Sequence, residues 1–265
     1  MGRGAAAFQA VRDSLILKDS PLKGIGTLSE KAVHRIIKNY LEPDISKQEQ
    51  PIGDFVADIY DGQEIKEIQT KNFAALKKKL TVFLEIAPVT IVHPIYLEKY
   101  INWVDPESGE IKDRRKSSHK GSIYDAMDEM LFLKSFLGNR LLKFMFLLLN
   151  AEEYRLLDGY GKDRKKRATK LDRIPTALIK EVDFCCPEDY GILLPPDCKE
   201  GFTAADYAGA AGIPSWRSQR TLYVLRAAGA VELVGKRGRS NLYRRSIGIK
   251  LRGDEGYGIG KHSSC

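Results

Sequence analysis

Three side chains able to bind a metal ion or orient a water lie on two neighbouring segments that have the composition of β-strands. Asp58 lies near the end of segment 55–60 (FVADIY), and Glu67 and Gln69 follow in segment 64–70 (EIKEIQT). An Asp-Gly pair between the two segments is typical of a tight hairpin turn. Residues two apart on a strand share a face, so a hairpin places Glu67 and Gln69 on one face, with Asp58 beside Glu67.

Asp58 and Glu67 are the predicted metal ligands. Two carboxylates held side by side repel each other unless a cation lies between them, and hard oxygen ligands suit Mg²⁺, with Mn²⁺ as the alternative. Such an ion can polarise a phosphoryl oxygen and acidify an attacking water. A purely structural interpretation also stands at this point, because acidic residues at strand ends are common on protein surfaces.

The segments around this pair have the periodicities of a mixed α/β domain. Residues 28–41 (LSEKAVHRIIKNYL) have apolar side chains at three- and four-residue spacing, which predicts an amphipathic helix that includes Glu30. A second helix is expected over residues 73–85 (FAALKKKLTVFLE), capped by Asn72, and a buried strand over residues 89–95 (VTIVHPI). The predicted order of helix, strand, strand, helix and strand indicates an α/β fold class.

This order of elements and the spacing D-x8-E-x-Q resemble the PD-(D/E)xK nuclease superfamily over roughly residues 25–95. In that superfamily an Asp closes one strand, a (D/E)-x-K motif follows on the next, and the preceding helix often supplies a further acid. The resemblance implies a restriction-endonuclease-like mixed-sheet core and metal-dependent hydrolysis of phosphodiester bonds. The catalytic residues that it implies are Glu30, Asp58, Glu67 and Gln69.

Gln69 stands where lysine is usual in the superfamily, although some of its restriction enzymes also carry glutamine there. Glutamine lacks the positive charge of lysine but can orient a water or the scissile phosphate. Lys71 lies on the same strand face if the strand continues, and it is an alternative source of charge. Of the two nearby histidines, His34 is interpreted as a half-buried or surface residue and His93 as a core residue at a strand end.

Later segments give weaker patterns. Residues 122–137 are expected to be helical. Residues 142–149 (LKFMFLLL) and 154–157 are interpreted as the arms of a hairpin, with a buried helix as the alternative for the first segment, because periodicity alone does not separate the two. Residues 185–200 contain three prolines and are predicted to be a linker that follows a first domain over residues 1–184.

Residues 201–250 follow a clearer order: a short alanine-rich helix, a turn, a longer helix and a β-hairpin with a basic tip. This order has the shape of a winged helix-turn-helix, which predicts a second, smaller domain followed by a tail over residues 251–265. In such a domain the second helix reads base edges and the hairpin tip contacts phosphates or the minor groove. Winged helices also serve as protein-interaction modules, which is the alternative. The predicted DNA contacts are Arg217, Gln219, Arg220 and Tyr223 on the helix, and Lys236, Arg237 and Arg239 at the tip.

The charge is distributed unevenly along the 265 residues. Of the net charge of +8, residues 201–265 carry +7 and the first two hundred residues carry +1. Within the latter, segments 112–120 and 162–170 have net charges of +4 and +5 and are predicted to be basic loops around an acidic body. Three basic patches favour a polyanionic partner, although a single run is often only a solvated face. The predicted backbone contacts in the loops are Arg114, Arg115, Arg164, Lys165, Lys166 and Arg167.

These features together predict a Mg²⁺-dependent DNA endonuclease with a winged helix for DNA binding. One alternative, favoured by Gln69, is an inactivated nuclease fold that acts as a DNA-binding or regulatory protein. Another is a nuclease that processes RNA. Cutting both strands with one site per chain favours a homodimer. The chain lacks a glycine-rich phosphate loop, so ATP-driven activity is not expected.

The sequence favours a cytoplasmic location. No apolar run reaches the ~18 residues of a membrane span, and the first nineteen residues lack an apolar segment followed by a small-residue cleavage site. The four cysteines lack a paired C-x-x-C spacing for zinc and are expected to be reduced. We therefore expect a protein without a membrane partner, associated with the nucleoid if the source is prokaryotic.

Overall fold

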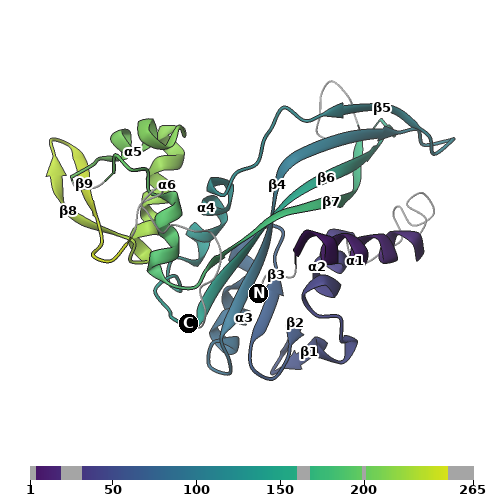
Figure 1. Ribbon diagram of the computed structural model, residues 1–265, viewed down its shortest axis with the longest axis horizontal. Helices are drawn as coiled ribbons and strands as arrows, with labels where there is room; N and C mark the ends of the chain where they lie inside the picture. Colours follow the sequence, from purple (N-terminus) through teal and green to yellow (C-terminus); the bar gives the residue numbers. More distant parts are fainter. Residues whose placement is uncertain (1–3, 19–31, 160–167, 199–200, 250–265) are drawn as a thin grey trace.

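The computed structural model describes residues 4–18, 32–159, 168–198 and 201–249. These residues form a mixed α/β structure around a seven-stranded sheet, as the sequence predicts (Figure 1). The strands of the sheet are β1 (Gln48–Ile52), β2 (Phe55–Tyr60), β3 (Ile65–Ile68), β4 (Val89–Val104), β5 (Ile111–Lys116), β6 (Leu142–Leu156) and β7 (Thr169–Phe184). Their order is β1-β2-β3-β4-β6-β7, with β5 paired to β4 beside this path. The β3–β4 and β4–β6 pairs are parallel, and the others are antiparallel.

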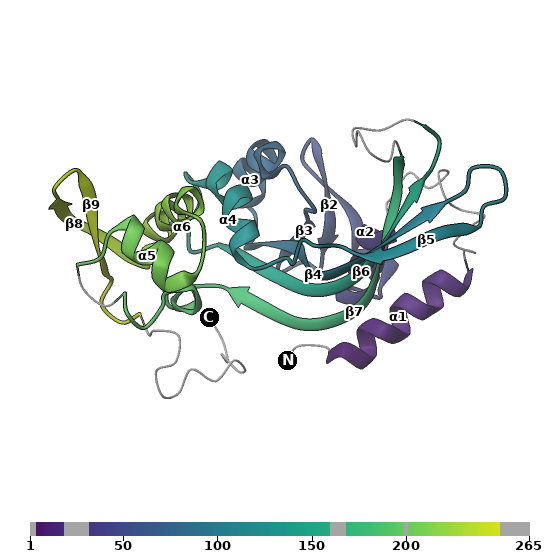
Figure 2. The same cartoon turned by 90° about the horizontal axis from the view of Figure 1, so that it is seen from above.

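Helices cover both faces of the sheet (Figure 2). One face carries α1 (Gly4–Lys18) and α2 (Ala32–Leu41), which the 3-10 helix η1 (Ile45–Lys47) joins to β1. The other face carries η2 (Phe73–Leu76), α3 (Lys77–Phe83), α4 (Tyr124–Met130) and η3 (Leu131–Leu133). Among the described residues, no helix combines the length and the apolar character that crossing a membrane requires.

The described residues bury a separate hydrophobic cluster on each face of the sheet. Phe8 and Ile37 belong to the cluster that includes Leu147, whereas Met130 belongs to the cluster that includes Phe146. Neighbouring residues of β6 therefore point into opposite clusters. A strand that is buried on both sides has an almost continuous apolar sequence instead of an alternating one, which explains the run LKFMFLLL.

Residues 142–156 form one strand, so the predicted hairpin in this segment is wrong. β6 runs parallel to β4 along the full length of both strands, from the pair Val89–Leu142 to the pair Val104–Leu156. The polar residues that suggested a turn, Asn150 and Glu152, lie half-buried within the strand. They follow the point where the chain leaves the two apolar clusters, and this change of environment accounts for the change in composition.

The basic segment 112–120 is a loop only in its second part, because residues 111–116 form strand β5 and residues 117–120 are irregular. Strand β5 pairs antiparallel with the outer half of β4, and all six of its side chains are exposed. Lysines and arginines on such an edge strand discourage further pairing. The chain then returns across β4, where the Gly121 N–H donates to the Tyr96 carbonyl oxygen (3.0 Å). A Cβ atom at Gly121 would lie 2.2 Å from that oxygen, so glycine is required there.

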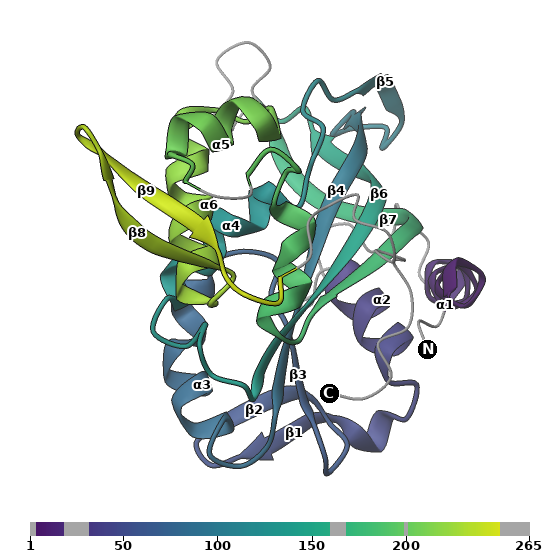
Figure 3. The same cartoon turned by 60° about the vertical axis from the view of Figure 1, so that its left-hand side comes forward.

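The C-terminal unit, residues 201–249, has the predicted order of helix, turn, helix and hairpin. Thr203 and Asp206 form a capping box at the start of its first helix. The hairpin projects away from the helices (Figure 3). The elements of this unit are α5 (Ala204–Ala211), α6 (Ser215–Ala227), β8 (Val231–Arg237) and β9 (Ser240–Arg245).

The segment before this unit is not an exposed linker. Residues 187–193 form the 3-10 helix η4 (Pro187–Leu193), and Tyr190 and Leu193 are buried in the same cluster as the α3 and α4 side chains. Leu222 and Leu225 of α6 belong to that cluster as well. The Tyr207 hydroxyl donates to the Leu193 carbonyl oxygen (2.6 Å). The C-terminal unit therefore shares one hydrophobic core with the sheet.

Candidate active site

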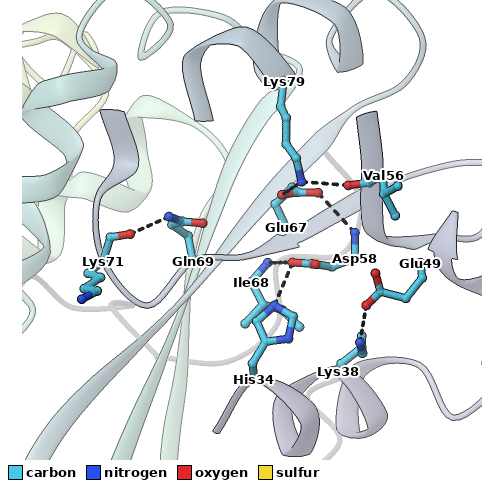
Figure 4. A network of polar contacts seen from close by, with 10 residues as sticks. All are labelled: His34, Lys38, Glu49, Val56, Asp58, Glu67, Ile68, Gln69, Lys71 and Lys79. Carbon is cyan, nitrogen blue, oxygen red and sulfur yellow. Dashed lines mark hydrogen bonds and ion pairs between the residues drawn. The ribbon is translucent and has the colours of Figure 1, made fainter. Parts of the chain in front are cut away.

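The β2–β3 hairpin brings Asp58 and Glu67 together, as predicted (Figure 4). Its register pairs Ile59 with Lys66, and one further step places Asp58 across from Glu67. At this step the backbone N–H groups bond to side-chain carboxylates of the opposite strand. The Asp58 N–H donates to Glu67 Oε1 (3.2 Å), and the Ile68 N–H donates to Asp58 Oδ2 (2.7 Å). Each carboxylate thus accepts a hydrogen bond from the backbone of the opposite strand, which fixes both side chains at the junction.

Glu67 is a buried carboxylate with a strongly shifted protonation equilibrium. Its side chain is 3% exposed. Burial, followed by repulsion from the Asp58 carboxylate, raises the pKa of Glu67 to about 7, against the opposing effect of Lys79. The Lys79 ammonium on α3 lies 2.9 Å from Glu67 Oε2 and also donates to the Val56 carbonyl oxygen (2.8 Å). The Lys79 ammonium therefore does not offset the combined effect of burial and of Asp58 on the pKa of Glu67.

His34 contacts the other carboxylate. Its Nε2 atom lies 3.1 Å from Asp58 Oδ2, and its side chain is 22% exposed. His34 is half-buried, which is one of the two environments predicted for it. Its contact with Asp58 makes it part of the candidate site. Lys38, one turn further along α2, is buried and pairs with Glu49 of β1. The same face of α2 therefore presents an imidazole and an ammonium to the β1–β2 edge.

Gln69 is not directed at the carboxylate pair. Its Nε2 atom donates to the Lys71 carbonyl oxygen (2.5 Å) and to the Asn72 carbonyl oxygen (3.2 Å). Figure 4 shows Gln69 and Lys71 away from the pair formed by Asp58 and Glu67. β3 ends at Ile68, so the alternation that predicted a shared face does not extend to residue 69. The cation beside the pair comes from α3 instead.

The roles of Lys79 and His34 are not evident from residue type, but their spacing from apolar residues indicates them. Lys79 follows Leu76 by three residues and precedes Phe83 by four, and His34 precedes Ile37 by three. Both spacings place the polar side chain on the covered side of its helix. His93 is a core residue, as predicted, since its side chain is 7% exposed, but it lies within β4 and not at a strand end.

Asp58 and Glu67 are the side chains of this site that could hold a metal ion. Asp58 and Glu67 supply hard oxygen ligands, and Mg²⁺ commonly binds one or two carboxylates and completes its shell with waters and substrate phosphates. A divalent cation bound between Asp58 and Glu67 would offset the repulsion between the two carboxylates. Among the described residues, no three His, Cys, Asp or Glu side chains form a group that could hold a metal ion. Glu30 lies outside the described residues.

Comparison with known proteins places this site within a family. A family model described as a domain of unknown function, DUF8091, matches residues 31–185, which is more than half of the chain. The chain belongs to the DUF8091 family. The DUF8091 match includes Asp58, Glu67 and Lys79 and ends before α5. A protein of Treponema pallidum (strain Nichols), described as uncharacterised, is 29% identical over 227 residues, which is 83% of this chain and 87% of that protein. No solved structure gives a match.

The two arginines predicted to read bases lie beyond the DUF8091 match, on α6, and both contact α4. Arg217 lies 2.8 Å from Asp125 and 3.7 Å from Asp128, and Arg220 lies 2.9 Å from Asp128. Arg217 was expected to be exposed, but it is half-buried by the packing of α6 on α4. The exposed positions expected for Gln219 and Tyr223 are confirmed. This face of α6 therefore serves, at least in part, to attach the C-terminal unit.

The remaining predicted contacts lie in three places. Lys236, Arg237 and Arg239 are exposed on the hairpin, where Arg237 pairs with Asp206 (3.1 Å). On β5, Arg114 stacks on Tyr100 and Arg115 stacks on Trp103, with 4.0 Å and 4.8 Å from the guanidinium carbon to the ring centre. The last four lie outside the described residues: Arg164, Lys165, Lys166 and Arg167.

Proposed function

We propose that this protein is a Mg²⁺- or Mn²⁺-dependent endonuclease that hydrolyses phosphodiester bonds in DNA. The observation that carries the proposal is the buried Glu67 carboxylate, with a pKa of about 7, fixed beside Asp58 where β2 and β3 meet. A restriction-endonuclease-like core, formed by α2, β2, β3, α3 and β4, agrees with the order of elements around this pair. The DNA-binding role belongs to the basic C-terminal unit and to β5.

Each side chain in the site has a distinct role in this proposal. Asp58 and Glu67 would hold the metal ion, and an ion bound there would supply Lewis-acid activation of the phosphoryl group and of the attacking water. The hydrogen bonds of His34 and Lys79 keep the two carboxylates oriented. Lys79 also supplies the positive charge that Gln69 lacks, next to the position where negative charge develops on the phosphate.

The primary test is a nicking assay on supercoiled plasmid, with Mg²⁺, with Mn²⁺ and with EDTA. We expect conversion to open circles with either metal and none with EDTA. Linear duplex, single-stranded DNA and RNA of matched sequence, assayed side by side, identify the substrate class. Faster cleavage of RNA than of every DNA form would contradict the DNA assignment.

A second candidate function is a DNA-binding protein without nuclease activity. It is favoured by the internal hydrogen bonds of both carboxylates and by the direction of the Gln69 amide. The same assay separates the two functions. Retained DNA binding without metal-dependent cleavage of any substrate would support this candidate and contradict the endonuclease.

The positions of Lys79 and Gln69 predict that their substitutions have unequal effects. Lys79→Gln should lower the cleavage rate by about tenfold to a hundredfold, because it removes a charge beside the reacting phosphate. Gln69→Ala should change it by no more than about twofold, since the amide faces the Lys71 and Asn72 carbonyl groups. Initial nicking rates measure both effects, and thermal unfolding followed by circular dichroism checks that each variant folds. A larger loss of cleavage rate in Gln69→Ala than in Lys79→Gln would assign the catalytic role to Gln69 instead of Lys79.

A further inference from the structure

A second cluster of charged side chains surrounds Glu153 on β6. This carboxylate is 1% exposed. Among the described residues, four basic side chains lie within ion-pair distance: Lys99 of β4 at 3.3 Å, Arg155 of β6 at 2.6 Å, Lys170 of β7 at 3.0 Å and Arg173 of β7 at 2.7 Å. One buried carboxylate thus lies among basic groups from three adjacent strands. We call these five residues the Glu153 cluster.

The Glu153 cluster has more positive charge than its own structure requires. One carboxylate against four cations leaves an excess of three positive charges. The neighbouring Asp172 carboxylate is directed elsewhere, because its oxygens accept from the Ala32 N–H (3.2 Å) and the Arg173 N–H (2.7 Å). A structural ion pair needs one cation per carboxylate, so the excess favours an additional anion.

The protonation equilibria of the two lysines agree with this excess. Burial, followed by repulsion from Arg173, lowers the pKa of Lys99 and likewise that of Lys170. Repulsion between the cations therefore contributes to both lowered pKa values, after burial. An oxyanion bound among them would offset that repulsion.

The cations lie on the outside of the cluster and the carboxylate lies inside. The side chains of Lys99, Arg173, Arg155 and Lys170 are 17%, 21%, 25% and 49% exposed. An oxyanion approaching from solvent would therefore meet N–H donors before it meets Glu153. Arg173 is additionally held over the Tyr96 ring, 4.1 Å from the ring centre, which restricts its guanidinium to one orientation.

The cluster lies on β4, β6 and β7, whose outer halves extend away from β1 and β2 (Figure 1). Glu67 pairs with Ile91 of β4, and Lys99 lies eight residues further along that strand. At about 3.3 Å per residue this is roughly 25 Å along β4. The two sites also face opposite sides of the sheet, because Glu67 shares a face with Ile65 of the α3 cluster and Glu153 shares a face with Leu149 of the α2 cluster. Arg115 of β5 pairs with Ile101 at the same end of β4, which extends the basic surface.

We propose that the Glu153 cluster binds a backbone phosphate of a nucleic acid, outside the cleavage site. The proposal rests on the proposed function for the identity of the polyanion. Four N–H-bearing side chains on a rigid sheet form the phosphate site, and Glu153 holds them in place from beneath. The contact is independent of base sequence, because phosphates carry no sequence information.

The test is a binding titration of a fluorescent 20-base-pair duplex in EDTA, repeated over a series of salt concentrations. The variants are Lys99→Met, Lys170→Met and the double variant, because methionine retains the aliphatic stem and leaves Glu153 paired with both arginines. Lys143→Met is the matched control, since Lys143 is also a half-buried lysine with an acidic partner, Glu64 at 3.8 Å. We expect the double variant to bind roughly tenfold more weakly and to lose about one unit of the salt slope, with the control unchanged.

The outcomes separate this inference from the proposed function. Unchanged affinity and salt slope in the double variant would overturn the phosphate site and leave the endonuclease standing. Absence of cleavage together with lysine-dependent binding would support the phosphate site and contradict the endonuclease. A wild-type protein that binds no nucleic acid would overturn both. If Lys99→Met does not fold, Lys170→Met carries the test alone, because Lys170 is the most exposed of the four cations.

Discussion

Replacing Asp58 by Asn or Glu67 by Gln is expected to lower metal-dependent cleavage by about a thousandfold or more. Each substitution removes a negatively charged oxygen from the pair, and metal stabilisation of the transition state contributes several kcal/mol. About 4 kcal/mol corresponds to this factor in rate. Each amide retains the shape of the carboxylate and one acceptor oxygen, so the single backbone hydrogen bond that each side chain accepts at the β2–β3 junction can persist. Initial nicking rates under saturating Mg²⁺ measure the loss.

Glu64→Gln is the matched control for these two variants. Glu64 lies on the same hairpin, is half-buried, and accepts a hydrogen bond from the Thr90 hydroxyl (2.7 Å). Its substitution should change the cleavage rate by no more than about twofold. DNA affinity in EDTA should be unchanged or higher in Asp58→Asn, because removing a negative charge reduces repulsion of phosphate. Cleavage that persists in both Asp58→Asn and Glu67→Gln would exclude the carboxylate pair as the active site.

The second large effect concerns the stability of the sheet. Glu153→Gln is expected to lower the free energy of unfolding by about 3 kcal/mol at pH 7, because it leaves buried cations without their counter-charge. Burial alone would raise the pKa of Glu153, but hydrogen bonds from Arg173, Lys170 and Arg155 outweigh burial and hold the pKa well below its ordinary value. Urea denaturation of both proteins measures the difference. Equal stability at pH 7 would contradict the prediction.

The pH dependence of this difference has a definite sign. Since the folded-state pKa of Glu153 is lowered, its contribution is fully present above the ordinary value of 4.5 and is lost as the pH falls towards the folded-state value. The difference between wild type and Glu153→Gln should therefore be constant above about pH 5 and shrink in more acidic solution. Glu152→Gln is the control, because this neighbour pairs with the exposed Arg114 and its loss should cost at most about 1 kcal/mol.

Local sequence patterns predict the hairpin that forms the site but not its full set of side chains. Segment 55–60 forms β2 with the predicted bounds, and the turn that follows gives the register that pairs Asp58 with Glu67. The role of Gln69 depends on where β3 ends, and alternation does not show that. Asn72 illustrates the same limit: its backbone is left-handed and its side chain makes no capping hydrogen bond. Lys79 reaches Glu67 only through the packing of α3 on the sheet.

Longer-range features of the fold depend on packing that composition does not reveal. Residues 142–156 read as a hairpin because apolar residues give way to polar ones, yet both halves lie on one strand. The prolines of residues 187–196 suggested a linker, but Tyr190 and Leu193 lie in the core. Arg217 looked exposed because helical periodicity describes one helix at a time. Its partners, Asp125 and Asp128, lie about ninety residues earlier in the chain.

The continuous core beneath the C-terminal unit has a consequence for where a bound duplex would be cut. A DNA-binding module on a flexible tether lets the nuclease reach many positions around the bound segment. Here α6 packs on α4 and shares a hydrophobic cluster with α3, whose Lys79 contacts Glu67. The hairpin tip and the carboxylate pair therefore keep a constant separation, and cleavage would fall at a fixed offset from the segment that the hairpin holds.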